Sequence, residues 1–255
     1  MFKFLRSIIY FYKYYSGPYR SWILAQRKSI GYNDNNIINK VRKSALIAKN
    51  SKSKFEIDSI IFSKPYRNIK FEKILANLDK KKKSIKIIDF GGSLGSTYYR
   101  YRDIFSSQKK IKWSIIEQKA FVKIGKKEFK DKNLDFFYNL EEFISKNINE
   151  QIDIFLLSSS LQYIKNYKKI IKKINKLNVN YVIILKTPMK LSKTNRIYVE
   201  KVPKQIYGTS YSSWAFSKEK LINSFTNYKL VHEKIVKPQH IYFIDSLIHS
   251  MSLIL

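Results

Sequence analysis

Three of the seven glycines in this chain of 255 residues fall within one short segment, Asp89-Phe90-Gly91-Gly92-Ser93-Leu94-Gly95. The segment follows an apolar, strand-like run and precedes a stretch with helical character from about Ser96. Glycine allows a sharp turn and a close approach of the backbone to a ligand, and the start of a helix offers free N–H groups. In open α/β sheets, ligands bind beyond the carboxyl ends of the strands. The segment is therefore a candidate ligand-binding loop, and a glycine-rich turn without a ligand is the alternative.

The residues around this loop favour one class of ligand. A dinucleotide-binding loop has the pattern G-x-G-x-x-G, but Phe90 occupies the place of its first glycine, and the phosphate loop G-x-x-x-x-G-K-[ST] is absent. Asp89 would repel a pyrophosphate, whereas it suits a cofactor that carries an amino group. Glu117 ends the next strand-like run, where a carboxylate can accept both hydroxyls of a ribose. Three glycines around an amino-acid moiety and a carboxylate on a ribose together predict S-adenosylmethionine as the cofactor.

From residue 85 onward, strand-like and helical stretches alternate. The strand-like runs are Ile85–Phe90, Ile111–Ile116, Leu134–Phe137, Ile152–Leu157 and Tyr181–Leu185. The clearest helix, at residues 164–177, has an apolar face and a face of lysines, which we interpret as solvated. A further helix from Ser217 to Thr226 is followed by strands near 229–236 and 240–248. This alternation predicts an α/β fold with a mostly parallel sheet and helices on both faces.

The first third of the chain has a different pattern. Residues 16–80 are predicted to be mostly helices joined by short loops, with Ile37, Val41, Ala45 and Ala48 at helical spacing. Four consecutive lysines at residues 80–83 are typical of a solvated linker. We therefore predict a helical N-terminal cap at residues 1–83 and a Rossmann-like domain at residues 84–255.

Residues 2–15 combine basic and apolar side chains. Lys3 and Arg6 precede an apolar run, but Lys13 interrupts it and no small-residue cleavage site follows, which argues against a signal peptide. The run is also too short to span a bilayer. As a helix, it would suit the surface of an anionic membrane, and packing on the body of the protein is the alternative. We expect a cytoplasmic protein, with peripheral contact to the inner face of the membrane as one option.

The composition limits the chemistry. The absence of cysteine excludes disulfides, Cys-ligated metals and thiol nucleophiles, and His232, His240 and His249 do not form a metal-ligand pattern. No metal site is therefore predicted. The formal net charge of +31 comes from 42 Lys and 8 Arg against 19 acidic residues. This charge attracts polyanions and anionic lipid, but a dedicated reader of nucleic acid would use more Arg. Nucleic acid is therefore the less favoured partner.

Blocks of sequence between about residues 17 and 231 share their order with a known family. The most specific of them is Asp89-Phe90-Gly91-Gly92-Ser93-Leu94-Gly95-Ser96, where most methyltransferases would have glycine in place of Ser93. The others are Gly17-Pro18-Tyr19-Arg20-Ser21-Trp22, Gly31-Tyr32, Phe55-Glu56-Ile57-Asp58-Ser59, Trp113-Ser114-Ile115-Ile116-Glu117-Gln118, Leu157-Ser158-Ser159-Ser160-Leu161-Gln162-Tyr163, Thr187-Pro188, Arg196, Val202-Pro203, Ile206-Tyr207 and Tyr211-Ser212-Ser213-Trp214-Ala215-Phe216-Ser217. With these blocks the chain resembles a bacterial family of S-adenosylmethionine-dependent methyltransferases often encoded among surface-polysaccharide genes. The resemblance implies a class I methyltransferase fold.

Two further segments are candidates for binding. Ser159, Ser160 and Gln162 follow the strand that ends at Leu157 and could hydrogen-bond the methionine part of the cofactor or the acceptor, and a satisfied strand-to-helix turn is the alternative. A connection of about 30 residues precedes Ser217, and connections of this length are usually functional or flexible. We predict cofactor contacts for Asp89, Gly91, Gly92, Gly95, Glu117, Gln118, Ser159 and Ser160, and acceptor contacts for Gln162, Arg196, Tyr207, Tyr211 and Trp214.

The predicted reaction is transfer of a methyl group to a small or glycan-linked acceptor. The link to surface polysaccharide, and with it an oxygen of a sugar as the methylated atom, comes from the resemblance. A hydroxyl acceptor must lose a proton, and Tyr163 and Glu200 are the candidates for the base, which the sequence does not identify. Two other functions stay open. One is a non-catalytic basic protein that binds anionic membrane or nucleic acid on the same fold, and the other is an RNA methyltransferase.

Overall fold

The computed structural model describes residues 14–31, 35–106, 110–148, 150–206, 208–235, 241–242 and 247–255. The chain divides into two compact units. The first unit consists of residues 1–34, 158–177 and 182–255, and the second consists of residues 35–157 and 178–181. Most of the segment 2–15, predicted to contact either membrane or protein, lies outside the described residues, and a domain boundary at residue 83 stays a prediction.

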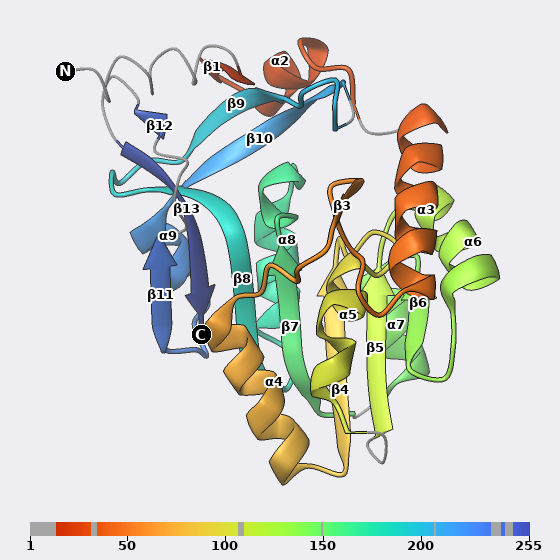
Figure 1. The fold of residues 1–255 in the computed structure, drawn as a ribbon. Coiled ribbons are helices and arrows are strands. Elements are labelled where there is room, and N and C mark those ends of the chain that lie inside the picture. The colour runs from red at the N-terminus through yellow and green to blue at the C-terminus, as the bar shows by residue number, and fades with distance from the viewer. Residues whose placement is uncertain are drawn as a thin grey trace. The chain divides into compact units, whose positions relative to one another are not determined.

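The second unit is built on four parallel strands in the order β7-β4-β5-β6 (Figure 1). They are β4 (Ser84–Phe90), β5 (Lys110–Ile116), β6 (Leu134–Phe137) and β7 (Ile152–Ser158). All residues from 152 to 157 are buried, as expected for a strand covered on both faces. The prediction of these four strands and of a parallel sheet is confirmed.

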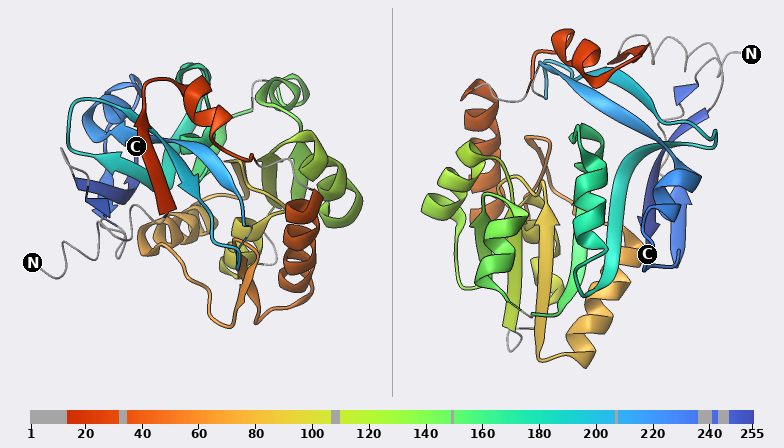
Figure 2. Two further views of the ribbon diagram at one scale, coloured as in Figure 1. Left: turned by 90° about the horizontal axis from the view of Figure 1, so that it is seen from above. Right: turned by 180° about the vertical axis from the view of Figure 1, so that it is seen from behind.

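Helices cover both faces of this sheet, with α5 on one face and α7 on the other (Figures 1 and 2). The helices of the unit are α3 (Asn35–Asn50), α4 (Ile69–Lys81), α5 (Ser96–Tyr101), η1 (Arg102–Ile104), α6 (Lys119–Ile124), η2 (Gly125–Phe129) and α7 (Leu140–Lys146). Between α3 and α4, the chain forms a hairpin of β2 (Phe55–Ile57) and β3 (Ile60–Phe62). The sequence pattern predicted helices and loops there, so this hairpin is a correction.

The first unit adds antiparallel strands. Its strands are β1 (Tyr15–Tyr19), β8 (Val179–Lys190, which belongs to this unit from residue 182), β9 (Arg196–Lys201), β10 (Ser210–Ser217), β11 (His232–Ile235), β12 (Ile241–Tyr242) and β13 (Leu247–Ile254). Its helices are α2 (Trp22–Arg27), η3 (Leu161–Tyr163), α8 (Tyr167–Ile174) and α9 (Lys218–Asn223). Strand β9 pairs antiparallel with β1 and β10, β10 pairs parallel with the end of β8, and β13 pairs antiparallel with β8.

The segment before Ser217, predicted as a long connection, is mostly strand. β8 continues to Lys190, and β9 and β10 form an antiparallel pair in which Tyr211 lies opposite Glu200. The β-branched and aromatic residues of this segment favour strands because they pack well on a pleated surface. The prediction of a connection is therefore wrong for most of this segment. In the part of the chain that is described, no helix has both the length and the apolar character needed to cross a membrane.

Candidate functional site

The glycine loop connects β4 to α5 in the second unit. The N–H of Gly91 donates to the carbonyl oxygen of Ile116 over 2.9 Å, which ties the loop to the neighbouring strand β5. Gly91 and Gly95 have φ angles of +76° and +97°, in the left-handed region that favours glycine. Gly95 is also the N-cap of α5. The loop therefore needs glycine at both of these positions for its backbone path.

Gly92 is required for a different reason. A Cβ at this position would lie 2.6 Å from Cγ of Asp89, 2.8 Å from Oδ2 and 3.0 Å from Oδ1. These distances are shorter than van der Waals contact, so any larger residue would displace the carboxylate. Glycine at this position lets the carboxylate of the preceding strand lie directly against the loop backbone.

Asp89 is fully buried at the end of β4 and is only partly satisfied. Its Oδ2 accepts a hydrogen bond from Nε1 of Trp113 over 3.1 Å, while its Oδ1 is buried without a hydrogen-bond partner. Burial raises the pKa of Asp89 to about 7, with a further rise from Glu117 and opposing effects of Trp113 and Arg100. A carboxylate with one free oxygen against a backbone loop can accept a bond from a cationic amino group.

Glu117 lies just beyond β5, next to the end of β4. Phe90 and Ile116 are paired residues of the two parallel strands, so Asp89 and Glu117 are brought to the same end of the sheet. Glu117 accepts hydrogen bonds from the backbone N–H groups of Gln118 and Ser93, while burial raises its pKa. The structure thus places six of the predicted cofactor residues, namely Asp89, Gly91, Gly92, Gly95, Glu117 and Gln118, around the ends of two adjacent strands.

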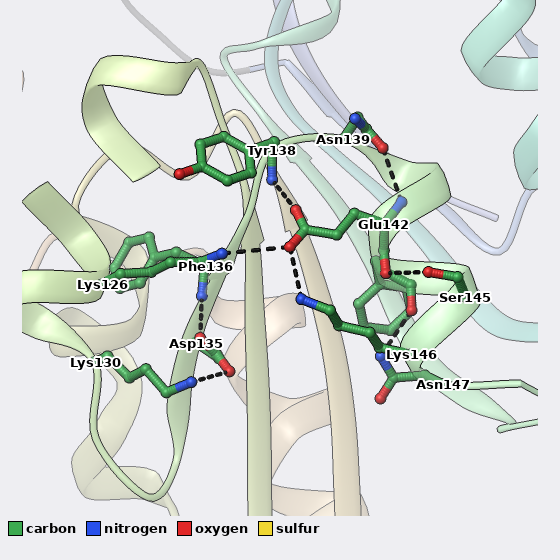
Figure 3. A network of polar contacts seen from close by, with 11 residues as sticks. Lys126, Lys130, Asp135, Phe136, Tyr138, Asn139, Glu142, Ser145, Lys146 and Asn147 are labelled. Atoms are coloured by element: carbon green, nitrogen blue, oxygen red, sulfur yellow. Dashed lines mark hydrogen bonds and ion pairs between the residues drawn. The ribbon is translucent and has the colours of Figure 1, made fainter. Parts of the chain in front are cut away.

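A polar network fixes the turn after the third strand, β6 (Figure 3). Oδ1 of Asn139 accepts from the backbone N–H of Glu142 over 2.8 Å, and the Glu142 carboxylate accepts from the N–H of Tyr138 over 2.7 Å. This reciprocal arrangement resembles a capping box. Although burial acts in the opposite direction, hydrogen bonds from Lys146, Tyr138 and Lys126 lower the pKa of Glu142 to about 2. The network holds the chain in place where it leaves the strand next to β5.

A shallow cavity of about 310 Å³ lies beside this network. Lys126, Lys130 and Lys146 contribute to its lining, but each forms an ion pair with Glu142 or Asp135. The cavity therefore offers an anion little unpaired positive charge. Within the described ranges, no group of three or more His, Asp or Glu side chains could hold a metal ion.

Glu56 is a residue near the loop that the sequence analysis did not identify as functional. It lies in β2 with only 2% of its surface exposed, and burial raises its pKa. Its carboxylate accepts from the hydroxyl of Ser96, the first residue of α5, and from the N–H of Ser59 over 2.5 Å. Nη2 of Arg100, one turn further along α5, lies 3.4 Å from the carbonyl oxygen of Glu56. The β2–β3 hairpin is thereby attached to the start of the helix that follows the glycine loop.

The residues that follow β7 belong to the first unit. Within the second unit, Leu156 of β7 pairs with Asp89 of β4. Residues 158–160 follow Leu156 by only two to four positions in the sequence. Ser160 and Gln162 are 9% and 2% exposed, and neither Oγ of Ser160 nor Oε1 of Gln162 has a hydrogen-bond partner. Buried polar atoms are rarely left unpaired. These two atoms are therefore candidates for hydrogen bonds to a ligand.

Tyr163 and Glu200, the two candidates for the base, are brought together although they are 37 residues apart. The hydroxyl of Tyr163 donates to Oε2 of Glu200 over 3.0 Å. The ring of Tyr211 lies 5.5 Å from that of Tyr163, in an edge-on contact. In this arrangement, the Glu200 carboxylate can take up the phenol proton of Tyr163 when the Tyr163 oxygen accepts a proton from another group.

The other predicted acceptor residues do not join this group. Trp214 stacks on Trp22 with ring centroids 5.5 Å apart, and its Nε1 donates to the carbonyl oxygen of Ile164 over 3.2 Å. Trp214 therefore contributes to packing within the first unit. Arg196 is the first residue of β9, whereas Glu200 lies near the other end of the same strand. Tyr207 lies outside the described residues.

Comparison with known proteins identifies the fold. No protein-family model and no curated protein matches the chain. The solved structure of the N-terminal domain of EvdMO1 with SAH bound is similar at a TM-score of 0.50 and 10% sequence identity, over 87% of this chain and 98% of that domain. The fold is that of the class I methyltransferases. At this level of identity, the similarity shows the fold alone.

Two further solved structures are similar at lower TM-scores. One is 1,6-didemethyltoxoflavin-N1-methyltransferase from Burkholderia thailandensis, with a TM-score of 0.40 and 11% identity over 71% of this chain and 75% of that chain. The other is a SAM-dependent methyltransferase from Methanosarcina mazei, with a TM-score of 0.43 and 9% identity over 68% of this chain and 92% of that chain.

Proposed function

We propose that the protein is an S-adenosylmethionine-dependent methyltransferase whose cofactor binds at the glycine loop. The observation that carries this proposal is the buried Asp89 carboxylate, which has a free Oδ1 against the backbone of Gly92. This atom fits the amino group of the methionine moiety, and Glu117 on the next strand fits the ribose hydroxyls. The EvdMO1 domain, which has the same fold, binds SAH. When bound, the cofactor supplies a methyl group on a sulfonium, which is reactive toward nucleophiles.

Gln162, Tyr163 and Glu200 are our candidates for binding and activating the acceptor. Methyl transfer is an in-line displacement that depends mainly on how the two reactants are positioned. Ser160 and Gln162 each have a buried polar atom without a partner, and the predicted roles of these atoms are a contact to the cofactor for Ser160 and to the acceptor for Gln162. If the acceptor is a hydroxyl, its proton would pass to the oxygen of Tyr163 as the phenol proton moves to Glu200.

We further propose that the acceptor is a small or glycan-linked molecule and that the methylated atom is an oxygen of a sugar. Two observations support this assignment. The chain resembles a family encoded among surface-polysaccharide genes, and the candidate acceptor residues offer hydroxyl and amide groups that suit a molecule rich in hydroxyls. Such a reaction would take place in the cytoplasm, where the donor is made.

Calorimetric titration with S-adenosylhomocysteine (SAH) tests the cofactor site. SAH is preferable to the methyl donor because it cannot turn over. We expect a Kd in the micromolar range, or about −8 kcal/mol, and no binding of NAD. Replacing Glu117 by Ala should weaken SAH binding about 30-fold, because a charged hydrogen-bond acceptor contributes about 2 kcal/mol. Glu219→Ala, which removes an exposed carboxylate on α9, is the matched control and should bind SAH like the wild type.

The absence of SAH binding by a folded sample would contradict the cofactor assignment. Equal losses in Glu117→Ala and Glu219→Ala would show that net charge, and not the ribose contact, determines the affinity. If SAH binds as expected, candidate sugars can be screened with labelled methyl donor, and an RNA substrate should remain unmethylated.

Replacing Glu56 by Gln should weaken SAH binding about tenfold, because the start of α5 and the loop before it would lose a buried charged hydrogen bond. Ser96→Ala removes the hydroxyl on the other side of the same contact and should have a similar effect. Both variants are to be compared by calorimetry and by thermal unfolding. A lower melting temperature with unchanged SAH affinity would show that Glu56 stabilises the hairpin without positioning the loop.

A further inference from the structure

Three large apolar side chains are exposed on the short helix α2 of the first unit and just after its end. Ile23, Leu24 and Ile30, all within eight residues, are 51%, 44% and 76% exposed. Large exposed apolar residues are ordinary when scattered, but a group of them commonly marks an interaction site.

The orientation of α2 is fixed by contacts on its other side. Ala25 is fully buried in a cluster with Ile197 and Val199 of β9, and Trp22 stacks on Trp214 of β10. At the end of the segment, the backbone N–H of Ile30 donates to Oγ of Ser210 over 3.0 Å. The exposed side chains are therefore presented by an element that is anchored to the sheet, and packing Ala25 leaves Ile23 and Leu24 facing outward.

Every charged residue in the segment that carries this apolar group is basic. Arg20, Arg27 and Lys28 are exposed next to it, and residues 14–31 contain no Asp or Glu. By contrast, many lysines of the second unit form ion pairs, such as those with Glu142 and Glu150. The surface formed by residues 20–30 thus combines apolar and cationic side chains without a carboxylate among them.

We propose that the α2 surface, residues 20–30, docks onto an anionic lipid bilayer. Apolar side chains enter the boundary between head groups and acyl chains, and flanking Arg and Lys side chains bind anionic head groups. Nucleic acid would use the three cations but would gain nothing from Ile23 and Leu24, so charge and apolar exposure together favour lipid.

Helix α8 also has exposed basic side chains, but its large apolar residues are mostly buried. Its lysines, including Lys168 and Lys172, are exposed, whereas Tyr167, Ile171 and Ile174 are buried within the unit. This helix offers charge without apolar side chains. It can attract any polyanion, but it has nothing to insert into a bilayer.

Co-sedimentation with phosphatidylcholine vesicles, with and without phosphatidylglycerol, tests the proposal on the full chain. The double variant Ile23→Ser/Leu24→Ser should bind the anionic vesicles roughly tenfold less tightly than the wild type. Its binding to heparin, which reports charge alone, should be unchanged. Ile69→Ser removes an apolar side chain that is 61% exposed on α4, and this matched control should bind vesicles like the wild type.

The charge contribution is tested separately. Arg27→Ala/Lys28→Ala should lose more vesicle binding than Lys168→Ala/Lys172→Ala, although both variants lose two positive charges. The proposal is overturned if the Ile23/Leu24 variant binds vesicles as tightly as the wild type, or if the two charge variants lose equally. Binding to heparin but not to vesicles would also overturn it and would point to a nucleic-acid partner. None of these measurements requires SAH, so they stand apart from the test of the methyltransferase function.

Discussion

Replacing Gly92 by Ala should weaken the binding of SAH by at least about 100-fold. The added Cβ would lie 2.6 Å from Cγ of Asp89, so the carboxylate must leave its position against the loop. Moving it breaks the bond to Nε1 of Trp113 and removes the oxygen proposed to bind the cofactor's amino group. Calorimetry with SAH measures the loss of affinity. Chemical denaturation should show a loss of stability of about 1–3 kcal/mol, as is usual for an overpacked site.

A double-mutant cycle separates this cause from a general disturbance of the loop. In an Asp89→Ala background, the carboxylate that would clash is absent, so adding Gly92→Ala should cost much less stability than it does in the wild type. Fully additive losses would show that the conformation of the loop, and not its contact with Asp89, requires glycine at position 92.

The sequence predicted the glycine loop and its strands because both depend on local signals. The buried strands β4 and β7 are short apolar runs, and glycines grouped at the end of such a run leave few alternatives. The same local signals misled in the region before Ser217. There, the sequence predicts a long connection, but most of the segment forms strands such as β9 and β10, and Trp214 packs within the unit.

Contacts between residues that are far apart in the sequence could not be predicted from the sequence pattern. The bond between Glu56 and Ser96 spans 40 residues, and periodicity within a segment says nothing about such a partner. The pairing of Tyr163 with Glu200 likewise depends on the antiparallel register of β9 with β10 and on the packing of η3 against β10. Their residue types make both side chains candidates for the base, but only the structure shows that they are within hydrogen-bond distance of each other.

The affinity for SAH should rise about tenfold between pH 6 and pH 8. Burial raises the pKa of Asp89 to about 7, so most of this carboxyl is protonated at pH 6 and ionised at pH 8. The cofactor's ammonium group favours the ionised form, and binding is therefore coupled to release of a proton. Calorimetry at several pH values, in two buffers with different heats of ionisation, measures both the affinity and the proton release.

Asp89→Asn provides the control, because it keeps the shape of the side chain and removes its titration. This variant should bind SAH more weakly at pH 8 and should lose the pH dependence. For the stability of the protein without ligand, the expected pH dependence has the opposite sign to that of the SAH affinity. A carboxyl whose folded pKa lies above its unfolded value of 3.8 binds protons more tightly in the native state, so stability falls as the pH rises from about 4 to 7. Asp89→Asn should flatten this part of the stability profile. An unchanged profile in the variant, together with a pH-independent affinity in the wild type, would show that the Asp89 carboxyl ionises at its ordinary pKa and does not bind the cofactor's amino group.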